Sequence, residues 1–152
     1  MSKLTEHERV ADLAQTCACL NLRRASRSIS NYYDRLFLEA VGLRSTQISQ
    51  LVVLYLAGPQ TIQEIAGRLG LDRTTLTRNL KLLEKAGLLE IEPGADQRTR
   101  QAALTGRGTT VLLKVLPIWE EAQVEMVQGL GAKQFSTLLT QLSDLTKLTQ
   151  EE

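Results

Sequence analysis

Residues 72–86 carry the side chains with the clearest chemical potential in this chain. At about 100° per residue in an α-helix, Leu76, Leu80 and Leu83 fall on one face, and polar side chains occupy the opposite face and its margins. Arginine can bridge guanine or hold a phosphate, and a threonine methyl can touch thymine. The segment therefore predicts a helix that reads the major groove of DNA; the alternative is a surface helix with solvated charges. The candidate DNA contacts are Arg73, Thr74, Thr75, Thr77, Arg78, Lys81 and Lys85.

A shorter helix is expected immediately before this segment. Thr61 and Glu64 form a capping box, in which each side chain satisfies a free amide at the start of a helix. Gly70 is typical of a helix end, since glycine adopts the left-handed conformation without steric cost. Asp72 can then cap the second helix through the amides of Thr74 and Thr75. Two helices joined by a tight turn form a helix-turn-helix, whose second member enters the major groove.

A β-hairpin is expected after Gly87. Leu89 and Ile91 alternate with glutamates, as in a half-buried strand, and Pro93-Gly94 begins a turn. Arg98 and Arg100 lie close to the tip of this hairpin, where an extended guanidinium could enter a narrow minor groove. Asp96 has the length needed to hold one of these arginines in place.

These segments resemble the MarR family of winged helix-turn-helix regulators. The resemblance rests on the helix DRTTLTRNLKLLEKAGLL, on the wing signature Asp96-Gln97-Arg98, and on LTGRG at residues 104–108. It implies that the helix of residues 72–86 lies in the major groove. It also implies that Arg98 reaches the minor groove, supported by Asp96. Members of the family are homodimers whose interface is built from both termini.

The fold class expected is mainly α with a small β-hairpin wing: a winged helix-turn-helix with long N- and C-terminal dimerisation helices. Residues 5–41 contain no proline or glycine and have a mostly helical apolar spacing, which predicts one long helix. Gly42 ends it, and Ser45 or Thr46 caps the next. We expect an N-terminal dimerisation helix over residues 1–44, a DNA-binding domain over residues 45–108, and C-terminal dimerisation helices over residues 109–152.

The C-terminal part predicts two further helices. Thr105 can cap a helix running to about Leu130, and Pro117 inside it should produce a kink because its amide is missing. The last helix has an apolar stripe of one phenylalanine and five leucines, too apolar to leave in water. Pairing of the terminal helices of two chains would bury these faces. The two-fold symmetry of such a homodimer predicts a near-palindromic DNA site.

Composition is compatible with DNA binding although the net charge is only +1. Residues 68–81 carry a local charge of +3, and residues 119–152 carry −4. Phosphate contacts depend on such local fields. No secretory or membrane-spanning segment is visible, and two cysteines fit a reducing compartment, so the expected location is the cytoplasm, without membrane contact.

Catalytic chemistry is not expected. The single histidine, His7, lies near the chain start, and no phosphate-binding glycine loop, metal-binding His/Cys cluster or nucleophile elbow occurs. The sequence therefore predicts no cofactor, no metal and no enzyme activity. The expected function is a sequence-specific transcriptional regulator, a homodimeric repressor released by a signal; activation remains an alternative. A winged module that contacts proteins without DNA is an alternative of another class.

Two alternatives concern the signal. A small aromatic or phenolic effector would bind where the first helix meets the winged domain, with Arg23, Arg27 and Tyr33 as candidate contacts; structural roles are the ordinary interpretation of all three. In the other, Cys19 senses peroxide, since Arg23 at i+4 could favour a thiolate and Cys19 is similar in position to the peroxide-sensing cysteine of the organic hydroperoxide regulators within the family. Cys17 and Cys19 would lie about 200° apart on a helix and could not readily pair.

Overall fold

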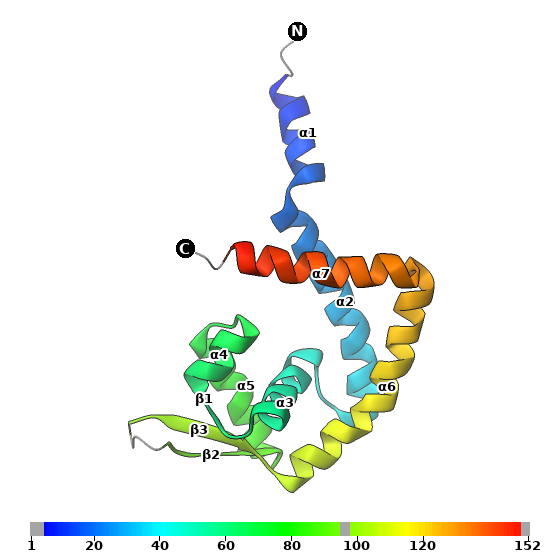
Figure 1. Cartoon of the computed structure of the whole chain (residues 1–152). Helices are drawn as coiled ribbons and strands as arrows, with labels where there is room; N and C mark the ends of the chain where they lie inside the picture. Colours follow the sequence, from blue (N-terminus) through cyan, green and yellow to red (C-terminus); the bar gives the residue numbers. More distant parts are fainter. Residues whose placement is uncertain (1–4, 95–97, 150–152) are drawn as a thin grey trace.

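The computed structural model describes residues 5–94 and 98–149. Seven helices and a three-stranded antiparallel sheet make up this part of the chain (Figure 1). The helices are α1 (Glu6–Thr16), α2 (Ala18–Val41), α3 (Ser45–Ala57), α4 (Ile62–Leu69), α5 (Arg73–Lys85), α6 (Gly106–Leu130) and α7 (Ala132–Leu148). The strands are β1 (Gln60–Thr61), β2 (Leu89–Pro93) and β3 (Arg100–Leu104), in the order β1-β3-β2. The mainly α fold with a β-hairpin wing is thus confirmed.

The winged domain is built from α3 to β3, and Phe37 of α2 with Leu112 and Val115 of α6 close its core. Leu51 of α3, Ile65 of α4, and Leu76, Leu80 and Leu83 of α5 have no exposed surface. Fully burying one such side chain stabilises the fold by roughly 1.5–3 kcal/mol relative to leaving it exposed. The face of α5 that the leucine spacing assigned to packing is therefore the packed face. Its opposite face is left for solvent or a ligand.

The prediction of one helix over residues 5–41 is wrong, because the helix is interrupted at Cys17. Cys17 has an extended backbone (φ −62°, ψ 113°), which ends α1 and precedes α2. The Asn21 side-chain amide donates to the carbonyl oxygens of Gln15 and Cys17 at 2.9 and 3.0 Å. The Cys17 carbonyl also accepts from the Asn21 backbone amide at 3.1 Å, so the Asn21 side chain adds a second donor there and links the end of α1 to the start of α2. Because Cys17 lies between the two helices, the angle of about 200° expected between Cys17 and Cys19 on one helix does not hold.

The start of α3 also differs from the expectation. Arg44 occupies the N-cap position, and Ser45 is the first helical residue. The Ser45 backbone amide and hydroxyl each donate to Asp34 Oδ1 at 2.7 Å, and Arg44 Nη1 donates to Asp34 Oδ2 at 2.9 Å. Gln47 accepts locally from the Arg44 amide at 3.0 Å, but the contact of Ser45 with Asp34, eleven residues earlier, could not be inferred from a local pattern. The carboxylate of Asp34 joins α2 to the first helix of the winged domain.

The long helices α2 and α6 pack side by side, and α7 turns back from the end of α6 (Figure 1). Thr105 caps α6 as expected, since its hydroxyl accepts from the Gly108 amide at 3.0 Å. The helix continues through Pro117 without a break and changes direction along its length. The helix ends close to the expected residue, with Leu130 as its last residue and Gly131 as its C-cap. Within residues 5–94 and 98–149, no helix combines the length and apolar character needed to cross a membrane.

Candidate nucleic-acid interface

The turn before α5 is built as the sequence predicted. Thr61 accepts from the Glu64 amide at 3.2 Å, and Glu64 accepts from the Thr61 amide at 2.7 Å, which fixes the start of α4. Gly70 ends α4 in the left-handed conformation, with φ of 61°. Asp72 Oδ1 then accepts from the Thr75 amide at 2.8 Å and caps α5. Hydrogen bonding from Thr75 holds the pKa of the Asp72 carboxyl below its usual value, so the cap is ionised at neutral pH.

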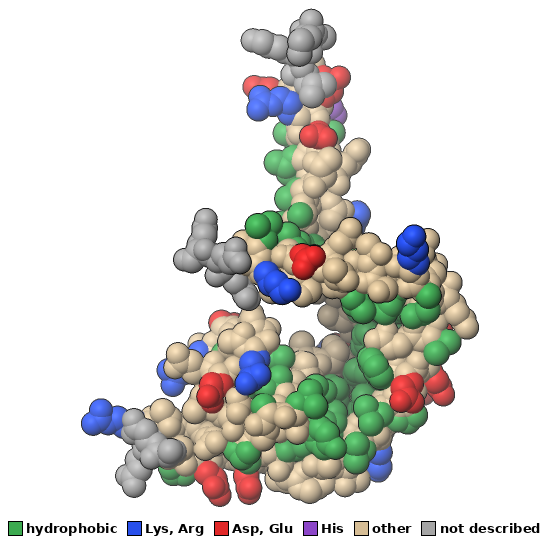
Figure 2. All heavy atoms as spheres, viewed as in Figure 1, with side chains coloured by type: hydrophobic (Ala, Val, Ile, Leu, Met, Phe, Trp, Pro, Cys, Tyr) green, Lys and Arg blue, Asp and Glu red, His purple; other side chains and the backbone are tan. Residues whose placement is uncertain are grey.

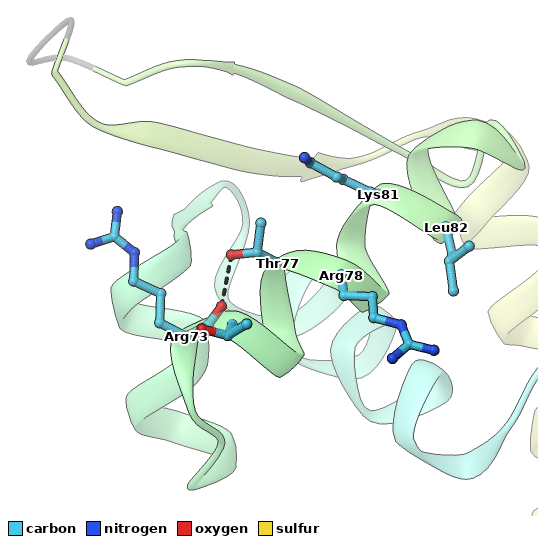
Figure 3. A pocket seen from close by; sticks show the side chains of 6 residues that line it. Arg73, Thr77, Arg78, Lys81 and Leu82 are labelled. Carbon is cyan, nitrogen blue, oxygen red and sulfur yellow. Dashed lines mark hydrogen bonds between the residues drawn. The ribbon is translucent and has the colours of Figure 1, made fainter.

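The outward face of α5 forms an open depression of about 580 Å³. Figure 3 shows its side chains projecting from one side of the helix, with the wing above them. None of the described residues that line it is acidic, which favours an anionic ligand such as a phosphate backbone. The lining residues are Arg73, Thr74, Thr77, Arg78, Lys81 and Leu82.

Five of the seven candidate contacts on α5 therefore lie together. Thr75 and Lys85 are exposed on the same helix but do not line the depression. Leu82, which sequence analysis left out, does line it and is 52% exposed. Its position four residues after Arg78 could have identified it, because residues at i and i+4 share a helix face.

One acidic side chain of α5 points elsewhere. Glu84 Oε1 accepts from the backbone amide of Ile91 in β2 at 3.2 Å. This bond ties the end of α5 to the first strand of the wing. The carboxylate is thus used in the contact between α5 and β2.

The hairpin predicted after Gly87 is present, with Leu89 opposite Leu104 and Pro93 opposite Arg100. The Gly94 amide donates to the Thr99 carbonyl at 2.9 Å on the way into the tip. Arg98 and Arg100 are both exposed near this tip. In Figure 2 a cationic side chain extends from this end of the molecule. The expected support of an arginine by Asp96 lies outside the described residues.

Strand β1 was not predicted. Gln60 and Thr61 pair with Ala102 and Gln101 of β3. Two residues are too few for an alternating pattern, so no local pattern indicated this strand. Because Thr61 also caps α4, the helix-turn-helix and the wing are joined at one point.

The close approach of α6 to the base of the wing depends on Gly108. A Cβ atom at this position would lie 1.9 Å from the carbonyl oxygen of Leu88. The Thr105 hydroxyl also donates to the carbonyl oxygen of Gly87 at 2.8 Å. The sequence LTGRG therefore holds the first turn of α6 against the segment that enters β2.

The candidate effector residues do not form one pocket. Arg23 and Arg27 are exposed and line an open depression on α2 with Arg24, Ser28 and Asn31. Tyr33 is half-buried instead, stacked on Phe37 with ring centroids 5.4 Å apart, and its hydroxyl lies 3.7 Å from Met126 Sδ. Burial raises the pKa of Tyr33. Cys19 is exposed, and Cys17 at the helix break is half-buried. Among the described residues, no cluster of His, Cys, Asp or Glu could hold a metal ion.

Comparison with known proteins agrees with this geometry. The model of the MarR family matches residues 41–99. The transcriptional regulator MhqR of Bacillus subtilis is 30% identical over 132 residues, covering 75% of this chain and 90% of MhqR. The regulator YkoM of the same organism is 32% identical over 120 residues, covering 78% and 77% of the two chains.

A solved structure extends the likeness to a DNA complex. The transcriptional regulator MosR of M. tuberculosis, crystallised with DNA, is 36% identical and has a TM-score of 0.78. The match covers 88% of this chain and 96% of MosR. These relatives are transcriptional regulators, and this chain is not an enzyme. The chain belongs to the MarR family of DNA-binding winged helix-turn-helix transcriptional regulators.

Proposed function

We propose that this protein is a homodimeric repressor that binds a near-palindromic operator and is released by a small-molecule effector. In each protomer α5 lies in the major groove and Arg98 reaches the adjacent minor groove. The single observation that carries the proposal is the depression on α5, whose lining in the described part of the chain consists of three cations, two threonines and one leucine. Such a surface suits both phosphate oxygens and base edges.

The dimer is supported by apolar surface that a single chain leaves exposed. Neither α1 nor α7 has a buried residue. Figure 2 shows apolar side chains along α1 and gathered over α3 and α6. Val10 and Leu13 of α1 are 65% and 56% exposed, and Leu139 of α7 is 53% exposed. Exposed apolar stripes of this extent mark interaction surfaces. Pairing of two chains through these helices places two copies of α5 on one face of the DNA.

The effector is proposed to be an aromatic or phenolic acid. Its carboxylate would meet Arg23 and Arg27, since the depression that they line has three arginines and, within residues 5–94 and 98–149, no acidic lining residue. Tyr33 would not contact the ligand, because it is packed against Phe37. A ligand that favours one spacing of the two α5 helices over another would change DNA affinity by its differential free energy for the two states.

DNA titration over a salt series tests the DNA-binding part of the proposal. Fluorescence anisotropy with duplexes from the region flanking the protein's own gene should show specific binding that weakens steeply with salt. Arg78→Ala should weaken binding by roughly 1–3 kcal/mol and relax sequence preference. Lys133→Ala on α7 is the matched control, since it removes a cation outside the winged domain. Equal affinity of wild type and Arg78→Ala for the preferred duplex would contradict the assignment of α5.

The same assay separates two kinds of signal. Phenolic acids should release wild-type protein, and Arg23→Ala should require more ligand for release. The specific observation that keeps peroxide sensing as a second candidate is the exposure of Cys19. Peroxide-induced release that persists in Cys19→Ser would remove that candidate. Repression is tested with a reporter gene placed under the bound duplex, whose expression should rise when the regulator is deleted.

A further inference from the structure

Thr77 lies within the outward face of α5, between two cations. Arg73 and Lys81 stand four residues before and after it, so the three side chains share one row along the helix. All three line the depression. Thr77 is half-buried, whereas Arg73 and Lys81 are exposed. A base edge held by the longer cations would therefore meet Thr77 at the helix surface.

The Thr77 hydroxyl is already engaged. Its Oγ1 donates to the carbonyl oxygen of Arg73 at 2.7 Å, the bond drawn in Figure 3. A hydroxyl has a single proton to donate. The bond to Arg73 also fixes the side-chain rotamer, since threonine on a helix adopts this rotamer when it bonds the i−4 carbonyl. In Figure 3 the methyl group consequently points away from the Arg73 carbonyl, on the side of α5 where Lys81 lies.

Thr74 provides an internal contrast. It lines the same depression and is exposed. Its hydroxyl makes none of the hydrogen bonds found among the described residues, so its proton is available to a ligand. Two threonines three positions apart thus present different chemistry: a free hydroxyl at Thr74 and a methyl group at Thr77.

From this geometry we propose that Thr77 recognises thymine by contact with its 5-methyl group. The major-groove edge of thymine offers a methyl group and the O4 acceptor. A hydroxyl whose proton is committed to Arg73 cannot donate to O4, but the γ-methyl is free to pack against the base methyl. Thr77 therefore determines specificity through an apolar contact rather than through a hydrogen bond. This inference rests on the proposed placement of α5 in the major groove.

The test begins with the duplex that wild-type protein prefers from a randomised duplex pool. Each thymine of that duplex is replaced in turn by uracil, which removes only the methyl group. Fluorescence anisotropy should show a loss of about fourfold in affinity at one thymine per half-site, the factor that corresponds to one buried methyl group. Losses at neighbouring thymines should be smaller.

Two variants then assign that methyl contact to Thr77. Thr77→Val keeps a methyl and removes the hydroxyl, so it should retain wild-type affinity and the sensitivity to uracil. Thr77→Ser keeps the hydroxyl and removes the methyl. It should bind the thymine duplex about fourfold more weakly and make no distinction between thymine and uracil. Thr137→Ser on α7 is the matched control, because the Thr137 hydroxyl bonds the Lys133 carbonyl at 2.9 Å in the same way.

Each contrary outcome has a defined meaning. The inference is overturned if wild-type protein binds equally well when any thymine is replaced by uracil. It is also overturned if Thr77→Val loses affinity and Thr77→Ser does not, because the hydroxyl would then be the group that recognises the base. In both cases Arg78→Ala still weakens binding if α5 reads the groove, so the proposed function stands. Normal binding by Arg78→Ala and by both Thr77 variants would instead overturn the placement of α5. Thermal melts followed by circular dichroism confirm that each variant is folded.

Discussion

The winged domain and the terminal helices use similar apolar patterns with opposite results. In the winged domain Leu76, Leu80 and Leu83 recur at helical spacing and are fully buried. In α7 leucines recur at the same spacing, yet Leu139 and Leu148 are 53% and 70% exposed. The periodicity of a helix shows which face is apolar but not which chain covers it. The α5 leucines are covered by elements of the same chain, α2 and α6 included, whereas the exposed leucines of α7 are not.

The strongest test of this contrast is Leu80→Ala in the closed core. Removing a fully buried leucine side chain should lower the free energy of unfolding by about 2–5 kcal/mol, because transfer and cavity costs add. Urea unfolding followed by circular dichroism should show the same decrease at low and high protein concentration. The control is Leu82→Ala on the same helix, which is 52% exposed and should cost less than about 0.5 kcal/mol. Similar losses in the two variants would contradict the face assignment.

Gly108→Ala tests the contact between α6 and the base of the wing. The added Cβ would meet the Leu88 carbonyl oxygen, which is backbone and cannot rotate away. Overpacking of this kind should lower the free energy of unfolding by about 1–3 kcal/mol. Gly106→Ala, two residues earlier, meets no atom within 4 Å and should be nearly neutral. Thermal or urea unfolding of both variants measures the two changes in unfolding free energy. Equal changes in Gly108→Ala and Gly106→Ala would refute the prediction.

Leu139→Ala addresses the open face of α7. If two chains bury this leucine, the substitution should raise the dimer dissociation constant about tenfold, equivalent to roughly 1.4 kcal/mol. Sedimentation velocity over a concentration series measures the shift. Lys147→Ala on the same helix is the control, since the exposed pair of Lys147 with Asp144 at 3.8 Å should contribute little. A wild-type protein that remains monomeric throughout the series would show that α7 is not a dimerisation helix.

Asp34→Asn tests the junction between the two regions and has the smallest expected effect, about 1 kcal/mol at neutral pH. Burial alone would raise the pKa of Asp34, but hydrogen bonds from Ser45 and the ion pair with Arg44 lower it below 3.8 overall. A lowered pKa in the folded state stabilises the protein above pH 3.8, and that stabilisation is lost as the pH falls through the folded-state value. The difference in unfolding free energy between wild type and Asp34→Asn should therefore shrink below pH 3.8. A difference independent of pH would show that the charge of Asp34 does not contribute.

Local sequence signals predicted most of the winged domain. The capping pairs Thr61 with Glu64 and Asp72 with Thr75 form the expected bonds, because both partners lie within three residues of each other. The Asp34 cap on α3 was missed because its partner lies eleven residues away. The break at Cys17 was missed because an asparagine side chain, rather than glycine or proline, compensates for it.

The candidate DNA interface was predicted in part, because helical spacing is also a local signal. A helical wheel placed Arg73, Thr74, Thr77, Arg78 and Lys81 together, and they line one depression. The helical wheel could not show whether a threonine hydroxyl is hydrogen-bonded to the backbone, since this depends on the side-chain rotamer. The structure does not bring the three candidate effector residues together, because Tyr33 stacks on Phe37 whereas Arg23 and Arg27 line an exposed depression.

The short strand β1 fixes the position of the wing relative to the helix-turn-helix. Because β3 is hydrogen-bonded on one side to β2 and on the other to the residues that start α4, the wing cannot swing independently of the helix-turn-helix. The proposed major-groove and minor-groove contacts would then stand at a fixed distance from each other. A duplex whose intervening steps are overwound or underwound would fit one contact and miss the other. Base steps that the protein never touches would thus influence affinity through their torsional stiffness.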